Sequence, residues 1–252
     1  MIDLTGRTAI VTGGSRGIGR AAARALAAAG ANVAIGYHSD HSAAGTLLEE
    51  LHLSGRHAVA SAGNLCLRES VERLFQAAVN AFGAIDIVVA NAGIWKRAPI
   101  ESMTDRQWQE TLDTNLKSAY LLCQAAAREM IPRRAGKIIL ISSTAGQRGE
   151  PFYSHYAASK GAIIALTKSL AGELGRWNIH VNAVAPGWVM TDMTAEVMQD
   201  DRFREAATRH IPLGRIATPD DVAGPVVFLA SQLADHVHGE VLNVNGGSVL
   251  CG

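Results

Sequence analysis

TAIVTGGSRGIGRAAARALAAA, residues 8–29, is the stretch that decides the predicted fold. Thr8–Thr12 is a short apolar, β-branched run typical of a strand, and Gly17–Ala29 is an alanine-rich helical stretch that ends at Gly30. The glycines between them permit positive φ and close approach of the backbone to a phosphate, which the amino end of the following helix stabilises. The pattern favours a nucleotide site, with a plain tight loop as the alternative.

Strand and helix signals alternate outward from this unit to the end of the chain. Further strands are predicted at Asn32–Gly36, His57–Ser61, Ile85–Ala90, Lys137–Ser142, Ile179–Val184 and Val241–Val244, and further helices at Ala43–Leu53, Arg68–Phe82, Asp105–Met130, Tyr153–Gly175 and Pro219–Leu233. This alternation predicts one α/β domain over residues 1–252: a Rossmann-like, doubly wound parallel sheet of about seven strands with helices on both faces. Residues 190–219 have no strong period and are expected to form a substrate lid, with an ordinary surface excursion as the alternative.

Composition narrows the class of partner. Lys plus Arg and Asp plus Glu balance at 23 each, so no net field draws the chain to nucleic acid or an anionic membrane. No charged leader and no apolar stretch of about 20 residues is present, which predicts a cytoplasmic protein without a membrane span. Cys66, Cys123 and Cys251 show no metal or disulfide spacing, and His236 with His238 is too few ligands, so no metal is expected.

A tyrosine and a lysine lie four residues apart in the predicted helix at Tyr153–Gly175. Tyr156 and Lys160 therefore share one helix face, where a cation favours the phenolate form of a tyrosine whose free pKa is about 10. Ser143 follows a strand at the sheet edge where open α/β folds bind ligands. By itself such a pair is more often surface decoration than a catalytic acid and base.

Six motifs in order make the chain resemble the short-chain dehydrogenase/reductase family, from Gly6 to Gly247. They are TGxxxGxG at Thr12–Gly19, Asn-Ala-Gly at Asn91–Gly93, Asn115, Ser143, the Tyr156/Lys160 pair and Pro186-Gly187. The glycine spacing and the length near 250 residues resemble the core oxidoreductase branch of the family.

The resemblance implies a role for each of these residues. Tyr156 would exchange a proton with the substrate oxygen while a hydride passes to or from the nicotinamide. Lys160 would lower the pKa of Tyr156 and hold the nicotinamide ribose, Ser143 would polarise the carbonyl, and Asn115 would anchor a water in a proton relay. The cofactor contacts implied are Gly13, Ser15, Arg16, Gly17, Ile18, Gly19, Tyr37, His38, Asn64, Asn91, Ala92, Gly93, Tyr156, Lys160, Pro186, Gly187, Val189 and Thr191. Asn91 has an equally weighted structural alternative, which is to tie the central strands together.

The loop after the second strand predicts NADP(H), with NAD possible. Folds that prefer NAD carry Asp or Glu at the position of Tyr37, where a carboxylate repels a 2′-phosphate. A neutral Tyr37 removes that repulsion, while Arg16 and His38 offer donors. Asp40 is the residue that a bent loop would bring to the ribose instead.

The substrate is less determined than the reaction class. The chain resembles 3-oxoacyl-[acyl-carrier-protein] reductases and, as the alternative, glucose or other secondary-alcohol dehydrogenases. Arg134 matches one basic position for an acidic carrier, whereas Trp177, beside Arg176, replaces the other. Relatives pair the helices at Asp105–Met130 and Tyr153–Gly175, which implies a homotetramer. A catalytically silent nucleotide sensor or scaffold is the alternative of another class.

Overall fold

A single parallel sheet organises the computed structural model, which describes residues 2–250. Its strands run in the order β3-β2-β1-β4-β5-β6-β7, and each neighbouring pair is parallel. The strands are β1 (Thr8–Thr12), β2 (Asn32–Tyr37), β3 (Ala58–Ala62), β4 (Ile87–Ala90), β5 (Gly136–Ile141), β6 (Ile179–Pro186) and β7 (Val241–Val244). The predicted seven-stranded Rossmann-like sheet is confirmed.

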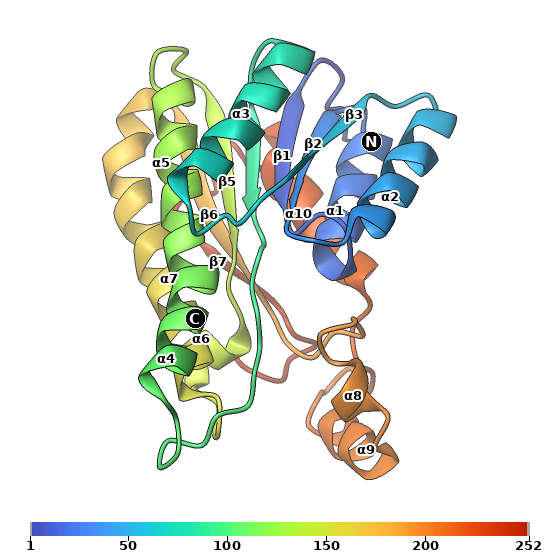
Figure 1. Cartoon of the computed structure of the whole chain (residues 1–252), viewed down its shortest axis with the longest axis vertical. Coiled ribbons are helices and arrows are strands. Elements are labelled where there is room, and N and C mark those ends of the chain that lie inside the picture. The colour runs from blue at the N-terminus through green and yellow to red at the C-terminus, as the bar shows by residue number, and fades with distance from the viewer. Residues whose placement is uncertain (1, 251–252) are drawn as a thin grey trace.

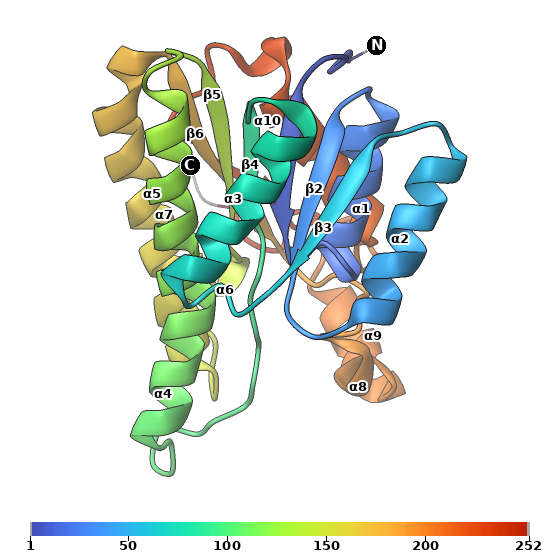
Figure 2. The ribbon, with the colours of Figure 1, turned by 45° about the horizontal axis from the view of Figure 1, so that its top comes forward.

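Helices cover both faces of this sheet (Figures 1 and 2). One layer is α1 (Gly17–Ala28), α2 (His41–Leu53) and α10 (Pro219–Ala230); the other is α3 (Arg68–Phe82), α5 (Ser118–Met130) and α7 (Ser154–Leu174). Alternate residues of a strand serve the two layers: Ala9 and Val11 pack in the first core, and Ile10 packs in the second. The central strand β4 is buried on both faces, and its sequence, IVVA, is accordingly a continuous apolar run.

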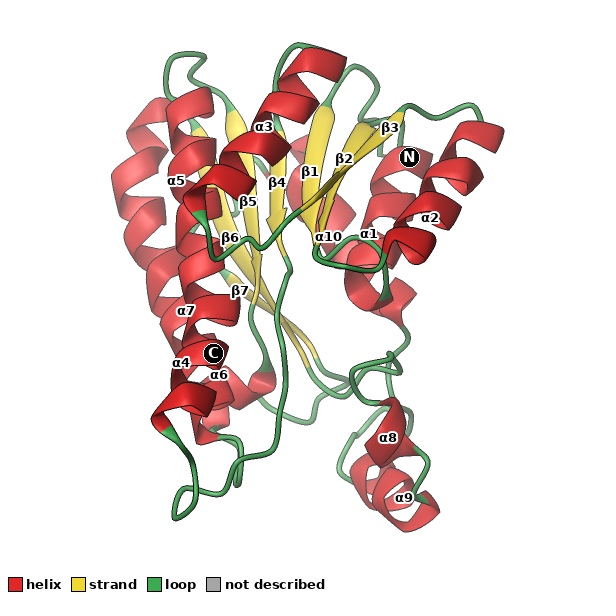
Figure 3. Cartoon of the chain, viewed as in Figure 1, coloured by secondary structure: helices red, strands yellow, loops and turns green. Residues whose placement is uncertain are grey.

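The carboxyl ends of the strands carry the longer connections, which Figure 3 shows as loops at the lower end of the molecule. β1 lies between β2 and β4, so the chain leaves β1 and β4 in opposite directions along the sheet. In open α/β sheets, ligands bind in the crevice that forms outside the carboxyl ends of the strands at such a reversal of strand order. The Gly13–Gly19 turn and Asn91–Gly93 are at this place.

Some predicted boundaries differ from the structure. The single helix predicted at Asp105–Met130 is α4 (Asp105–Leu112), a π-helical turn at Asp113–Lys117 and α5 in succession. A short helix α6 (Thr144–Arg148) follows β5 and was not predicted. The irregular segment after β6 contains α8 (Ala195–Met198) and α9 (Asp201–Arg209), which extend below the sheet in Figure 1. Two 3-10 turns, Gly175–Trp177 and Gln232–Ala234, end the helical segments before β6 and β7.

Candidate active site

A pocket of about 120 Å³ lies at the carboxyl ends of β4, β5 and β6. It brings together three of the four predicted catalytic residues, Ser143, Tyr156 and Lys160. Its remaining lining is Ile18, Asn91, Gly93, Trp95, Ile141, Ser142, Thr144, Arg148, Glu150, Pro186, Gly187, Trp188, Val189, Thr191, Met193 and Thr194. Segments spread along the chain from Ile18 to Thr194 therefore meet at one small site.

Ser143 and the Tyr156/Lys160 pair reach this pocket from consecutive elements. Ser143 caps α6, where its Oγ accepts a hydrogen bond from the Ala145 backbone N–H at 3.1 Å. Tyr156 and Lys160 lie one turn apart on α7, with the Lys160 Nζ 5.8 Å from the centre of the Tyr156 ring. The Ser142 hydroxyl donates to the Lys160 carbonyl at 2.8 Å, which is a structural role.

Burial moves the pKa values of this pair in opposite directions. It raises the pKa of Tyr156 to about 12, against the opposing effect of a hydrogen bond with Ser143, and the Glu150 charge adds to the rise. It lowers the pKa of Lys160 to about 8. Burial is the largest cause of the shift at Tyr156 in the cofactor-free chain, so the lowering of the tyrosine pKa by Lys160 stays a prediction. The ammonium is directed to the Ile141 carbonyl at 2.7 Å.

Asn115 lies behind the pocket and holds the chain that follows β4. Its Oδ1 accepts from the Ile94 N–H at 2.7 Å, and its Nδ2 donates to the Ile94 carbonyl at 3.0 Å and to the Ser159 Oγ at 3.1 Å. A Cβ placed on Gly93 would lie 3.2 Å from Asn115 Oδ1 and 3.6 Å from Lys160 Nζ, so these two side chains approach the same spot. The π-helical turn contains Asn115, and such turns are frequent at functional sites.

The glycine turn after β1 fits a dinucleotide. Gly13 and Gly17 have φ values of +63° and +54°, and a Cβ on Gly19 would overlap the Gly13 carbonyl oxygen. Arg16 is the N-cap of α1 and makes no side-chain capping bond, so its side chain does not occupy the first N–H groups of the helix, which can bind an anion. Ser15 is buried in the same turn, and Ile18 extends to the catalytic pocket.

Asn91 carries the structural role that its alternative reading predicted. Its Nδ2 donates to the Thr12 carbonyl at 2.9 Å, and the N–H groups of Asn91 and Ala92 donate to the Thr12 Oγ1 at 3.0 and 3.1 Å. These bonds join the ends of β1 and β4. Asn91 and Gly93 also line the pocket, so the structural role leaves them within reach of a ligand.

The groups expected to recognise a 2′-phosphate lie beside the glycine turn. Tyr37 ends β2, and its hydroxyl is hydrogen-bonded to the His41 Nδ1 at 2.9 Å, while His38 is exposed. Asp40 caps α2 through its Oδ1, which accepts from the Ala43 N–H at 3.0 Å. Within residues 2–250 no carboxylate forms an ion pair with Arg16. The local charge therefore favours an anion.

The other predicted cofactor residues are distributed around the same edge. Asn64 follows β3, where its Oδ1 accepts from the Cys66 N–H at 3.0 Å and its side chain is outside the catalytic pocket. Pro186, Gly187, Val189 and Thr191 line the pocket from the end of β6. The Gly187 N–H donates to the Val244 carbonyl at 3.0 Å, which fixes this segment to β7.

Two charged residues of the pocket were missed in the sequence. Arg148 ends α6, and Glu150 lies in the connection between α6 and α7, where burial raises its pKa. Phe152, in the same connection, is 54% exposed and outside the pocket lining, and the Arg97 guanidinium lies 4.6 Å from the centre of its ring. The sequence offered one indication that these two charged residues line the pocket, which is their position shortly after the strand that ends before Ser143.

The histidines are structural or lie outside the pocket. His155 is buried on α7 with neither ring nitrogen bonded to a described residue, and burial lowers its pKa. His238 is bonded to the Val181 N–H and the Ala171 carbonyl. Among residues 2–250 no cluster of three His, Cys, Asp or Glu side chains is arranged for a metal, and Cys251 lies outside the described residues. No helix in this range is long and apolar enough to cross a membrane.

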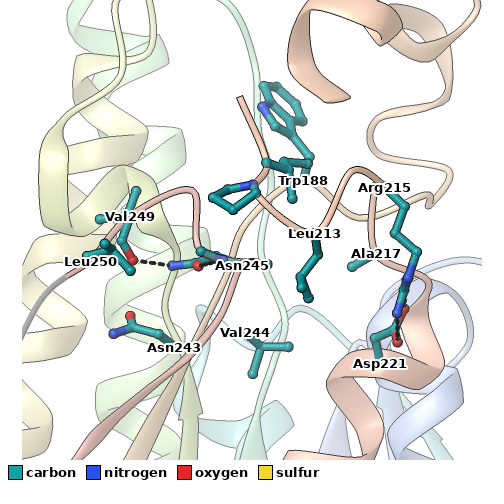
Figure 4. A pocket seen from close by; sticks show the side chains of 14 residues that line it. Trp188, Leu213, Arg215, Ala217, Asp221, Asn243, Val244, Asn245, Val249 and Leu250 are labelled. Carbon is teal, nitrogen blue, oxygen red and sulfur yellow. Dashed lines mark hydrogen bonds and ion pairs between the residues drawn. The ribbon is translucent and has the colours of Figure 1, made fainter. Parts of the chain in front are cut away.

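Aromatic side chains form the outer wall of the site. Trp95 stacks on Tyr153 at 4.3 Å between ring centres, and Trp188 meets Trp95 and Phe203 edge to face at 5.7 and 5.3 Å. Trp188 also borders a second cavity of about 770 Å³, whose other lining comes from residues 211–221 and 243–250 (Figure 4). Phe203 belongs to α9, so the segment expected to be a lid packs on the rim of the pocket.

Comparison with known proteins identifies the family. The family described as Enoyl-(Acyl carrier protein) reductase matches residues 13–248. L-rhamnose 1-dehydrogenase (NAD(P)(+)) of Azotobacter vinelandii is 44% identical over 248 residues, 97% of both chains. The 3-oxoacyl-[acyl-carrier-protein] reductase FabG of Staphylococcus aureus is 39% identical over 241 residues, 96% of this chain and 97% of that one.

A solved structure of a proposed NAD(P)-dependent gluconate 5-dehydrogenase from Beutenbergia cavernae, with NADP bound at low occupancy, superposes with a TM-score of 0.92. It is 40% identical, and the match covers 98% of each chain. This chain therefore belongs to the short-chain dehydrogenase/reductase family of oxidoreductases, as its motifs predicted.

Proposed function

We propose that the chain interconverts a carbonyl compound and a secondary alcohol with a nicotinamide cofactor, and that it prefers NADP(H) over NAD(H). The observation that carries the proposal is the convergence of Ser143, Tyr156 and Lys160 on a pocket that continues to Ile18 of the glycine turn. The relative that acts with NAD(P)(+) and the similar structure that holds NADP support the same cofactor class.

The residues around this pocket divide the work of holding the cofactor. The diphosphate would be bound by Gly13, Ser15, Gly17, Ile18 and Gly19, and the 2′-phosphate by Arg16, Tyr37 and His38. The adenine would lie next to Asn64, and the riboses would be contacted by Asn91, Ala92, Gly93 and Lys160. The carboxamide would be bound by Pro186, Gly187, Val189 and Thr191. When bound, the nicotinamide supplies or accepts the hydride.

The chain itself supplies the proton. With a pKa of about 12, the Tyr156 phenol is protonated at neutral pH and donates to a carbonyl oxygen during reduction. The Ser143 hydroxyl donates a hydrogen bond to the same oxygen. The Lys160 ammonium stabilises the phenolate that remains, and Asn115, next to Lys160, positions a water that returns the proton.

Tyr156→Phe tests this assignment. Turnover of ketones with NADPH should fall about 10²–10⁴-fold, while NADPH affinity, measured by fluorescence titration, stays the same. Tyr120→Phe, on the exposed side of α5, is the matched control and should keep full turnover. Normal turnover of the Tyr156 variant would remove this residue from the mechanism. Binding of NADPH without turnover of any carbonyl by the unchanged chain would instead support the sensor or scaffold alternative.

Two substrate classes each have an observation in their favour. A 3-oxoacyl-[acyl-carrier-protein] substrate is favoured by the cavity beyond Trp188, which has Ile211, Pro212 and Leu213 along it and is wide enough for an acyl chain. A sugar or other polyol is favoured by the charged and aromatic lining of the catalytic pocket. Rates with a 3-oxoacyl thioester and with aldoses separate the two.

Basic residues near the amino ends of β5 and β6 give partial support to an acyl carrier protein as a partner. The guanidinium groups of Arg134 and Arg176 each lie 5.2 Å from the centre of the Trp177 ring. This arrangement puts two exposed cations at the place where the expected basic pair is interrupted by Trp177.

A cytoplasmic homotetramer completes the proposal. Light scattering should give about four times the chain mass of 26.6 kDa, and the mass of a single chain would contradict it.

A further inference from the structure

A fixed cluster of Trp95, Glu150 and Tyr153, called the Trp95 cluster below, borders the catalytic pocket. The Trp95 and Tyr153 rings are stacked with an interplanar angle of 3°, and the Trp95 Nε1–H donates to the Glu150 Oε2 at 3.4 Å. Trp95 and Glu150 line the same pocket as Ser143 and Tyr156. The mechanism proposed above uses no member of this cluster.

Backbone contacts hold the two loops of the cluster together. The Ala98 N–H donates to the Phe152 carbonyl at 2.9 Å, which joins the loop after β4 to the loop before α7. The Tyr153 N–H donates to the Glu150 carbonyl at 3.1 Å and closes a tight turn. Phe152 in that turn has a φ of +68°, an uncommon conformation for a bulky residue that persists where its surroundings impose it. The Glu150 carboxylate is thus preorganised.

The Glu150 carboxylate is partly removed from water, and few protein hydrogen bonds replace those that it would make to water. Among the described residues, the long bond from Trp95 is the one hydrogen bond made by its side-chain oxygens, although a carboxylate accepts about four. A partly buried charge without enough donors is costly, and its raised pKa reports that cost. A ligand whose hydroxyl groups donate hydrogen bonds to Glu150 would offset this free-energy cost.

We propose that Glu150 and Trp95 recognise a neutral polyhydroxylated substrate, an aldose or related polyol, whose hydroxyls donate to Glu150 while its C–H surface packs against Trp95. This assignment rests on the proposed carbonyl/alcohol chemistry and names its substrate class. Trp188 lies edge to face with Trp95 and supplies a second apolar surface at the same pocket. Glu150 is then a specificity-determining residue beside the reacting groups.

The other substrate classes fit this pocket less well. A 3-oxoacyl thioester has no hydroxyl groups to replace the water that Glu150 loses, so it leaves this partly buried carboxylate short of hydrogen-bond donors. A sugar acid would carry a second negative charge toward Glu150. Arg148 is exposed at the rim, so it meets such an anion where solvent screens the attraction. Charge and hydrogen bonding therefore both select a neutral polyol.

Glu150→Gln tests the proposal, because it keeps the shape of the side chain and removes its charge. We would measure kcat/KM with NADP for L-rhamnose, D-glucose, D-gluconate and cyclohexanol, and with NADPH for a 3-oxoacyl thioester. The unchanged chain should favour an aldose over cyclohexanol, and Glu150→Gln should lower that ratio at least about tenfold. Glu101→Gln, an exposed change of the same charge outside the pocket, should keep the ratio.

The outcomes separate this inference from the proposed function. An unchanged aldose-to-cyclohexanol ratio in Glu150→Gln, or a higher kcat/KM for gluconate or the thioester than for either aldose, overturns the inference while the dehydrogenase function stands. If no alcohol or carbonyl in the panel is turned over by the unchanged chain, the proposed function fails as well. Trp95→Leu should also lower the ratio, because it removes the flat apolar surface.

Discussion

Arg16→Ala is expected to lower kcat/KM for NADPH about tenfold while the value for NADH stays within about twofold. Arg16 lies at the N-cap of α1, beside the end of β2, and it has no acidic partner among the described residues. Asp40, the residue that would repel a 2′-phosphate, is held at the start of α2 by the Ala43 N–H. The arginine is therefore free to bind the phosphate, whereas one oxygen of the Asp40 carboxylate is already bonded to the backbone of α2.

The expected fall of about tenfold in kcat/KM for NADPH follows from the solvent exposure of the loop that carries Arg16. A hydrogen bond between a guanidinium and a phosphate contributes about 1.5–3 kcal/mol, and exposed charge pairs contribute no more than about 1 kcal/mol. Arg16 is exposed, so a value near the lower limit of the first range is expected. About 1.4 kcal/mol corresponds to a factor of ten. His38 is exposed next to Tyr37 and retains a small part of the preference in the variant.

The assay is the initial rate of carbonyl reduction at varied NADPH and NADH, at low and at physiological ionic strength. Arg24→Ala is the control, because Arg24 is on the same helix and its charge is already paired with Glu50 at 2.7 Å. Only Arg16→Ala should change the NADPH-to-NADH ratio. A higher kcat/KM for NADH in the unchanged chain, or an equal loss with both cofactors in Arg16→Ala, would refute the reasoning.

Two other variants probe the site through binding and stability. Gly19→Ala should abolish binding of either cofactor, measured by titration calorimetry, because its Cβ would overlap the Gly13 carbonyl oxygen; retained affinity would show that the turn yields easily. Lys160→Met should remove activity yet stabilise the cofactor-free chain at pH 7 by about 1–3 kcal/mol in urea unfolding. The folded-state pKa of Lys160, about 8, is below its usual value of 10.5, so the penalty of burying the ammonium is complete below pH 8 and shrinks as pH rises. The gain should thus be smaller at pH 9.5, and a gain that grows with pH would contradict it.

The sheet and the glycine turn could be predicted because their causes are local. Nearly continuous apolar runs such as Ile85–Ala90 indicate strands covered on both faces, and Gly13 and Gly17 have the positive φ that only glycine adopts readily. The placement of Ser143 at the end of β5 followed from the same periodicity.

The features that depend on distant contacts could not be predicted in this way. The π-helical turn around Asn115 is an insertion within a long helical pattern, and its bonds to Ile94 and Ser159 come from other parts of the chain. Glu150 lies between Gly149 and Pro151, where a carboxylate suggests an exposed turn. Its burial arises from Trp95, 55 residues earlier in the chain.

The same carboxylate connects substrate recognition with proton transfer. Burial raises the pKa of Tyr156 and the Glu150 charge adds to the rise, so Glu150 helps to keep the phenol in the proton-donating form that reduction needs. Oxidation of an alcohol needs the phenolate, and hydroxyl groups that donate to Glu150 spread its charge and weaken the repulsion of that phenolate. Glu150→Gln should accordingly shift the rise of kcat/KM for alcohol oxidation to lower pH, while the other polar side chains that line the pocket with Tyr156, Ser143, Arg148 and Lys160 among them, are unchanged. A rise at the same or higher pH in the variant would mean that Glu150 acts on the substrate alone and that recognition and proton transfer are independent in this site.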